Sequence, residues 1–192
     1  MKKLLITGFD PFDSATINPS WEAVNLLPDT IGAYQLYKLQ IPTVFGVAFE
    51  TILTEAQKIC PDVIIAVGQA GSRSAVTPER IGINVRDARI CDNAGNSPKD
   101  EPIVPHGPDG YFSTLPVKAM ITAIQEAGLP AAISNTAGTF VCNDVLYSLL
   151  HHYAGTDVRC GFIHVPWLPQ QGEPNLSLER TAKALEIAIS VL

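Results

Sequence analysis

The chain has 192 residues, of which 46% are hydrophobic and 17% charged, and this balance excludes an intrinsically disordered protein. The net charge of −6, without a cluster of lysines and arginines, argues against a protein that binds nucleic acid or an anionic membrane surface. No uncharged apolar run approaches the ~20 residues of a membrane-spanning helix. Because neither repeats nor a linker-like segment divide the chain, we expect a single domain over residues 1–192.

Strand and helix patterns alternate in the first half of the chain. Apolar or alternating runs predict strands over residues 3–7, 34–41 and 63–67, with a further candidate over 81–88. A helix is predicted from Asn18 to about Leu27, since Asn suits the capping position and Pro19 is tolerated in the first turn. Residues 47–59 carry apolar side chains at helical spacing and end before Pro61, so they predict a second helix.

The second half opens with an irregular stretch, residues 91–116, which is rich in Gly, Pro, Asn and Asp and is typical of a functional loop. Helices are predicted over 117–127, 141–153 and 177–192, and strands over 131–134 and 160–165. Strands separated by helices indicate an α/β fold with an open, twisted, mainly parallel sheet and helices on both faces, in three layers. Ligands of such sheets bind at the carboxyl ends of the strands.

Cys142 is the candidate nucleophile. It follows a turn of small residues, 135–139, at the predicted start of a helix, where the helix dipole lowers the pKa of a thiol and favours thiolate. Backbone N–H groups there could also hold an oxyanion. The alternative is a buried cysteine that packs as a small hydrophobe. The other cysteines, Cys60, Cys91 and Cys160, form no C-x-x-C pair and no zinc spacing, so we expect reduced thiols in a cytoplasmic protein.

His164 and Glu79 are the candidate base and its partner. His164 lies at the carboxyl end of a predicted strand, and the ordinary pKa of its imidazole suits general acid–base catalysis. Glu79 precedes another strand, from which a carboxylate could accept the imidazole N–H and fix its tautomer. Alternatives are a histidine bonded to a loop carbonyl and a surface glutamate paired with Arg80 or Arg86.

Two other kinds of site are weaker candidates. The segment 68–73, Gly-Gln-Ala-Gly-Ser-Arg, could hold a phosphate with its backbone N–H groups and Arg73, but it lacks both glycine-rich nucleotide motifs. A metal site would have to draw on side chains without a helix-spaced ligand pair: Asp10, Asp13, His106 and Asp109. The cysteine mechanism requires no cofactor and no metal.

Taken together, these residues make the sequence similar, nearly end to end, to the pyroglutamyl-peptidase I family, also called pyrrolidone-carboxylate peptidases. The shared segments are 7–12, 18–21, 68–71, 78–80, 83–84, 87–90, 92–93, 134–143 and 164–166. The resemblance implies a triad of Cys142, His164 and Glu79 in a cysteine exopeptidase that removes an N-terminal pyroglutamyl residue from peptides through a thioester acyl-enzyme. It also implies the open α/β fold, a cytoplasmic location and a homotetramer.

The resemblance further implies a set of binding residues. Arg89 and the backbone of Cys142 would lie at the oxyanion, and the pyroglutamyl pocket would be formed by Phe9, Phe12, Asn18, Gln69, Phe140 and Val141. Apolar walls with few hydrogen bonds suit a neutral lactam, although ordinary core packing is the alternative for both Phe9 and Phe12. The sequence departs from many relatives at Asp13-Ser14, where they carry a glycine pair, and at Cys91, where they carry proline.

Two other functions remain open at this point. The alternation of strands and helices also suits a nucleoside phosphorylase-like transferase, which would require phosphate and be indifferent to thiol reagents. A non-catalytic binder of modified peptide ends would bind such peptides without turnover.

Overall fold

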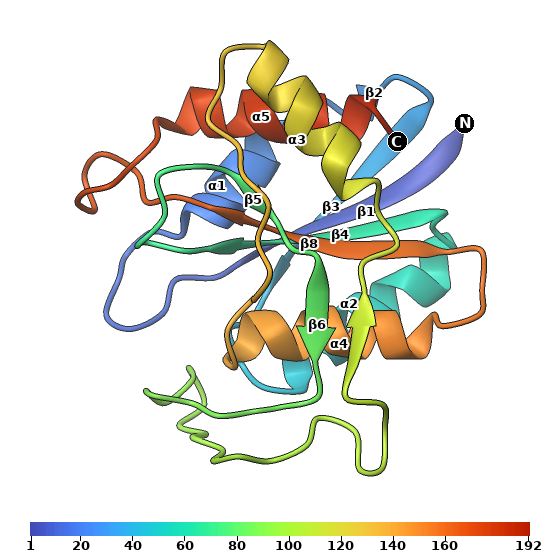
Figure 1. Ribbon diagram of the computed structural model, residues 1–192, viewed down its shortest axis with the longest axis vertical. Helices are drawn as coiled ribbons and strands as arrows, with labels where there is room; N and C mark the ends of the chain where they lie inside the picture. Colours follow the sequence, from blue (N-terminus) through green and yellow to red (C-terminus); the bar gives the residue numbers. More distant parts are fainter.

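The computed structural model describes residues 1–192, and its centre is a six-stranded sheet with the order β2-β3-β1-β4-β8-β5 (Figure 1). Four strands run parallel: β1 (Lys2–Phe9), β3 (Tyr34–Ile41), β4 (Val63–Gln69) and β8 (Arg159–Val165). Short antiparallel strands close both edges, β2 (Thr30–Ile31) and β5 (Thr77–Pro78). The predicted α/β class with a mainly parallel sheet is therefore confirmed.

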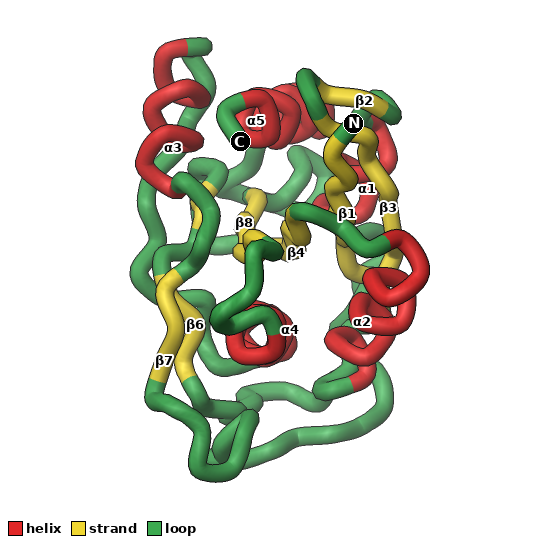
Figure 2. Tube along the Cα trace, turned by 90° about the vertical axis from the view of Figure 1, so that its right-hand side faces the viewer, coloured by secondary structure: helices red, strands yellow, loops and turns green.

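Helices cover both faces of the sheet (Figures 1 and 2). One face carries α1 (Pro19–Leu26), α3 (Val117–Glu126) and α5 (Leu178–Ser190), and the other carries α2 (Val47–Ile59) and α4 (Val141–His152). All five helices lie where the sequence predicts them, with ends that differ by at most one or two residues. None of them is both long and apolar enough to cross a membrane.

The strands contribute side chains to two separate apolar clusters, because successive side chains point to opposite faces of a sheet. On β1, Leu4 and Ile6 belong to a cluster of 24 buried residues under α1, α3 and α5, whereas Leu5 belongs to a cluster of 16 under α2 and α4. Leu4, Leu5 and Ile6 are all inaccessible to solvent. The double burial explains why the central strands are continuous apolar runs rather than alternating ones.

A second, two-stranded sheet pairs β6 (Ile81–Ile83) with β7 (Gly110–Phe112) beside α4 (Figure 2). The prediction of a strand over 81–88 is therefore wrong beyond residue 83, and β7 lies inside the stretch predicted to be irregular. Gly82 allows the close packing, because a Cβ atom there would come within 3.0 Å of the backbone nitrogen of Tyr147 in α4.

Residues 131–134 are not a regular strand, contrary to the prediction. They run beside residues 76–80, and Ala132 and Ser134 donate backbone hydrogen bonds to Val76 and Pro78. The ladder is interrupted at Pro78, which has no N–H to donate in return. Only isolated bridges at Ala131 and Ser134 remain of the expected pairing.

Candidate active site

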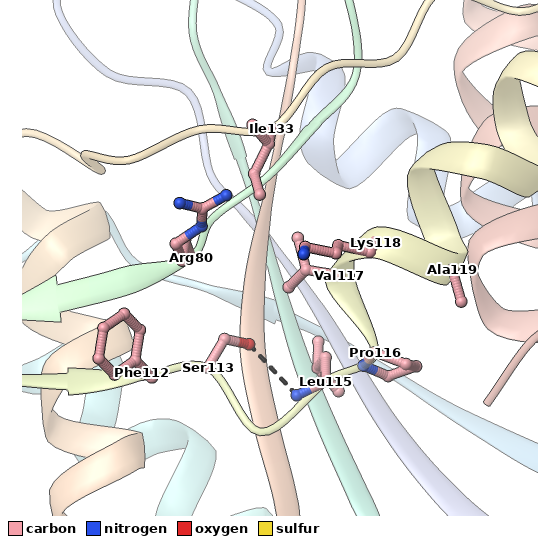
Figure 3. A pocket seen from close by; sticks show the side chains of 9 residues that line it. All are labelled: Arg80, Phe112, Ser113, Leu115, Pro116, Val117, Lys118, Ala119 and Ile133. Atoms are coloured by element: carbon pink, nitrogen blue, oxygen red, sulfur yellow. Dashed lines mark hydrogen bonds between the residues drawn. The ribbon is translucent and has the colours of Figure 1, made fainter.

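The largest cavity, of about 890 Å³, opens at the carboxyl ends of β4 and β8. Cys142 and His164 both line it, so the predicted nucleophile and base face one space. A second cavity of about 380 Å³ lies against α3 and β7 (Figure 3), with apolar walls and the side chains of Arg80 and Lys118. It contains neither a thiol nor an imidazole, and we therefore consider only the larger cavity as a candidate active site.

The start of α4 and the backbone of β4 position Cys142. Cys142 is the second residue of α4, and the capping residue Phe140 makes no side-chain hydrogen bond to the first turn. The N–H groups of Val141, Cys142 and Asn143 are therefore free to bind a ligand atom, whereas that of Asp144 donates to the carbonyl of Phe140. A Cβ atom on Gly68 would lie 2.9 Å from the sulfur of Cys142. Gly68 is the direct neighbour of His164 across β4 and β8, so the thiol lies above the pair of strands that carries the imidazole.

His164 is held in one orientation by Glu79. Its Nδ1 lies 2.7 Å from Oε1 of Glu79, and both side chains are buried, with exposed fractions of 4% and 0%. A carboxylate can only accept, so Nδ1 carries the proton and Nε2 of the neutral ring is free to accept one. The backbone N–H of Glu79 donates to the carbonyl of Phe162, which fixes the carboxylate beside β8. The alternative partners Arg80 and Arg86 do not pair with Glu79, and Arg86 binds Asp144.

Arg73 also contacts Glu79, although no pattern in the sequence predicts a role for it in the triad. Its Nη1 donates to Oε1 of Glu79 at 2.6 Å and to the hydroxyl of Thr77 at 2.5 Å, and its Nη2 donates to the carbonyl of Thr136 at 2.9 Å. The guanidinium that the phosphate hypothesis required is thus engaged with a carboxylate. No carboxylate lies within ion-pair distance of Arg89, the other arginine at the cavity.

Burial determines the protonation of the thiol and the imidazole. It raises the pKa of Cys142 to about 12, and the Glu79 charge acts in the same direction against the opposing charge of Arg73. Burial lowers the pKa of His164, although the hydrogen bond and charge of Glu79 oppose this. The expectation that the helix dipole lowers the Cys142 pKa is therefore wrong, because loss of solvation outweighs it. Both shifts favour a neutral thiol and a neutral imidazole before substrate binds.

Glu79 remains ionised in spite of its burial. Burial acts to raise the pKa of its carboxyl group, but the hydrogen bond from His164, the charge of that ring when it is protonated, and the hydrogen bonds of Ser134 and Arg73 outweigh it and lower the pKa. An ionised carboxylate at this position can stabilise a positive charge on His164 during a proton transfer.

Four of the residues expected to bind substrate or oxyanion line the cavity: Phe12, Gln69, Arg89 and Phe140. The rings of Phe12 and Phe140 lie 6.1 Å apart between centroids, and Phe45 packs edge-on against Phe140 at 5.2 Å. Phe12 and Phe140 thus give the cavity, which Cys142 also lines, an apolar wall that Phe45 supports from behind Phe140.

The other three expected binding residues are buried and do not line the cavity. Phe9 is 2% exposed and packs on Phe162 under α2 and α4, because the end of β1 points it to that face. Val141 is fully buried in the same cluster. Asn18 caps α1 by accepting from the N–H of Ser20, and its amide donates to the carbonyl of Asp10 at 2.9 Å. These three residues therefore have a supporting position outside the cavity lining, and their direct contact with substrate stays a prediction.

Several cavity residues lie in segments noted from the sequence but without a predicted individual role: Ala70, Gly71, Ser72, Asp87, Ile90, Thr136, Ala137, Gly138 and Thr139. Three more come from a loop that no sequence pattern indicated: Trp167, Glu173 and Pro174. A Cβ atom on Gly71 would lie 2.0 Å from the ring of Trp167, so a glycine is required for this wall to close. Asp13, also at the cavity, and Ser14 have φ angles of 52° and 60°. Glycine adopts such angles most easily, so the backbone here would suit the glycine pair that the family resemblance places at these positions in many relatives.

No three side chains of His, Cys, Asp or Glu come close enough together to hold a metal ion. Asp10, one of the weaker metal candidates, instead accepts from the backbone N–H of Thr43 at 2.7 Å. All four cysteines are free thiols, and Cys60 and Cys91 are exposed.

Comparisons with known proteins agree over the full length of the chain. A family model described as pyroglutamyl peptidase matches residues 2–192. The pyrrolidone-carboxylate peptidase of Escherichia fergusonii is 51% identical over 196 residues, covering 98% of this chain and 92% of that protein. The protein of the same name from Bacillus cereus is 47% identical over 199 residues, covering 100% and 93%. The crystal structure of Bacillus amyloliquefaciens pyroglutamyl peptidase I is similar with a TM-score of 0.96 and 46% identity, covering 99% and 96% of the two chains.

Proposed function

The chain belongs to the pyroglutamyl peptidase family of cysteine peptidases, and we propose that Cys142, His164 and Glu79 form the triad with which it removes an N-terminal pyroglutamyl residue from peptides. The family resemblance predicted from the sequence is confirmed. The proposal for the triad depends on one observation: the imidazole bonded to Glu79 shares its cavity with the sulfur above Gly68.

The first step is attack by the thiol on the carbonyl carbon of the pyroglutamyl residue. Because the resting thiol is neutral, Nε2 of His164 takes its proton while the carbon–sulfur bond forms. The electron pair of the carbonyl π bond moves to oxygen. Glu79, which accepts from Nδ1, stabilises the imidazolium that results.

The oxyanion is held at the start of α4. The backbone N–H of Cys142 and the guanidinium of Arg89 are the proposed donors, and one such donor is typically worth ~2.7–4 kcal/mol. The intermediate collapses when the carbon–nitrogen bond breaks and His164 gives its proton to the leaving amine. Water then attacks the thioester, His164 takes a proton from that water, and the carbon–sulfur bond breaks to release pyroglutamate. The thiolate regains its proton from His164.

The cavity suits a neutral ring better than an open-chain glutamate. Phe12 and Phe140 supply apolar surface, and Gln69 supplies polar groups that can bond to the lactam. An open-chain N-terminal glutamate would bring an ammonium and a carboxylate against these rings, and unpaired charges lose solvation there at a cost of several kcal/mol.

Three broader properties belong to the same proposal. The two apolar clusters share one sheet, which supports a single domain over residues 1–192. We also propose a cytoplasmic location, in which the exposed thiols Cys60 and Cys91 would remain reduced. A homotetramer is proposed from the family resemblance alone.

Hydrolysis of a fluorogenic pyroglutamyl amide tests the proposed triad. We expect Cys142→Ala and Cys142→Ser to abolish release of the fluorophore, and Cys60→Ala, which changes an exposed thiol on the far end of α2, to leave it unchanged. A pyroglutamyl substrate analogue should protect Cys142 from alkylation by iodoacetamide, with the label located by peptide mapping. Activity that persists in both Cys142 variants would remove this residue as the nucleophile.

A further inference from the structure

Arg73 connects the two halves of the candidate active site. It lies in the turn after β4, and one of its terminal nitrogens binds Glu79 and Thr77 on the β5 side of the cavity. The other binds the carbonyl of Thr136, six positions before Cys142 in the segment that leads into α4. The guanidinium of Arg73 therefore contacts both Glu79, which binds His164, and the segment that leads to Cys142.

Glu79 has few other means of being held in place. Its carboxylate is fully buried, Oε1 accepts from both His164 and Arg73, and Oε2 has no hydrogen-bond partner. Without Arg73, the carboxylate would keep only the imidazole and the nearby hydroxyl of Ser134, which itself donates to the carbonyl of Thr136. A buried carboxylate with so little compensation either takes up a proton or moves toward water, and both changes would release the imidazole.

We propose that Arg73 is a positioning residue of the peptidase reaction, which holds Glu79 against His164 and fixes the segment that leads to Cys142. This inference rests on the proposed function of the triad. Arginine suits the task because its donors are arranged in a rigid fork that can bind a carboxylate, a hydroxyl and a carbonyl at once. A lysine would bring the same charge without that fixed geometry.

The charge of Arg73 has a second effect on the same imidazole. The titratable groups around His164 are Glu79 from the β5 side, Arg73 from the turn after β4 and Cys142 from α4, and the shared cavity also carries Asp13, Asp87, Arg89 and Glu173. The positive charge of Arg73 lowers the pKa of His164, whereas the Glu79 charge raises it. Arg73 therefore helps to keep the imidazole neutral, as a base that takes a proton from a neutral thiol must be.

Two variants of Arg73 distinguish the effect of its hydrogen-bonding geometry from the effect of its charge. In Arg73→Gln, we expect kcat on the fluorogenic pyroglutamyl amide to fall at least ~10-fold with little change in KM. The glutamine amide can still donate one hydrogen bond to Glu79 and keep it beside the imidazole, so removal of the cation should move the acidic limb of the kcat/KM profile to higher pH. In Arg73→Lys, the charge stays and the fork is lost, so kcat should fall while the limb stays in place. Arg180→Gln, which removes an exposed cation on α5, should change neither.

Chemical rescue distinguishes positioning from a role in folding. We expect millimolar guanidinium to restore part of the kcat of Arg73→Ala, and sodium chloride at the same ionic strength to restore none. If Arg73→Gln folds and keeps the wild-type kcat and acidic limb, the inference is wrong. If Arg73→Gln does not fold, an unchanged kcat in Arg73→Lys overturns it. An inactive wild type would instead contradict the proposed function, because the Arg73 comparison presupposes turnover that depends on Cys142.

Discussion

Gly68 and Cys142 meet at a point where the chain has no room for one more carbon atom. A Cβ atom at residue 68 would lie 2.9 Å from the sulfur of Cys142 and 2.6 Å from the ring of Phe162. Because residue 68 of β4 has no side chain, the first turn of α4 can pack directly against the backbone of the sheet. This places the thiol above the residue that neighbours His164.

Gly68→Ala should therefore lower kcat about 100-fold or more, since small displacements of a reacting group can cost that much. Gly161→Ala is the matched control, because its Cβ atom would collide with Leu115 at 2.4 Å in the core under α3. Both variants should lose about 1–3 kcal/mol of stability through overpacking, measured by urea unfolding, but Gly161→Ala should keep its kcat. Equal kcat values in the two folded variants would show that the fit at Gly68 is unimportant for catalysis.

His164 and Glu79 should differ in how much activity their loss removes. His164→Ala eliminates the base and should cost ~10²–10⁴-fold in kcat/KM. Glu79→Gln keeps the shape of the side chain and should cost less, because the imidazole is still present though no longer fixed in its tautomer. Thermal unfolding of both variants checks that the proteins are folded. A larger loss in Glu79→Gln than in His164→Ala would assign the carboxylate more than an orienting role.

The pH dependence of the reaction follows from the two neutral groups. His164 acts as a base only when it is unprotonated, and burial lowers its pKa below the ordinary value of 6.5. The kcat/KM profile should therefore stay high at pH 6.5 and fall only at lower pH. The pKa of Cys142 is raised to about 12, so its rate of alkylation should still increase where that of a small thiol, with a pKa of about 8.5, levels off. A plateau near neutral pH would indicate a preformed thiolate–imidazolium pair instead.

Local patterns in the sequence predicted the helices well and the long-range contacts poorly. The ends of α2 follow from its apolar spacing and from Pro61, both of which are local. The broken pairing of residues 131–134 depends on Pro78, more than fifty positions away, and the contact of Arg73 with Thr136 spans a similar distance. No local signal could have indicated either. The period-two pattern of β1 did contain a signal for Phe9, because it places this ring on the same face as the buried Leu5.

The protonation of Cys142 was mispredicted for a related reason. Its place at a helix start can be inferred from the sequence, and that feature alone would lower the pKa of the thiol. Its burial depends on how α4 packs against β4 and β8, which only the folded structure contains. The two effects have opposite signs, and the larger one is the one that sequence patterns do not display.

Asn18 provides a final prediction, because it caps α1 and also binds the loop that leads to the proposed substrate pocket. Its Oδ1 accepts from the backbone N–H and the hydroxyl of Ser20, and that hydroxyl accepts from the N–H of Phe9. Its amide holds the carbonyl of Asp10, at the start of the loop that carries Phe12 to the cavity. Asn18→Ala should cost about 0.5–2 kcal/mol through loss of the cap and should also raise KM for the pyroglutamyl amide.

Ser177→Ala is the matched control for Asn18→Ala. Ser177 caps α5 by accepting from the N–H of Arg180, and it does not line the cavity. We expect it to lose a similar free energy of unfolding while KM stays at the wild-type value. Loss of a cap by itself would then be excluded as the cause of a raised KM. If both variants changed KM equally, the hydrogen bond from Asn18 to Asp10 would have no separate part in shaping the pocket, and the supporting position assigned to Asn18 would reduce to helix capping.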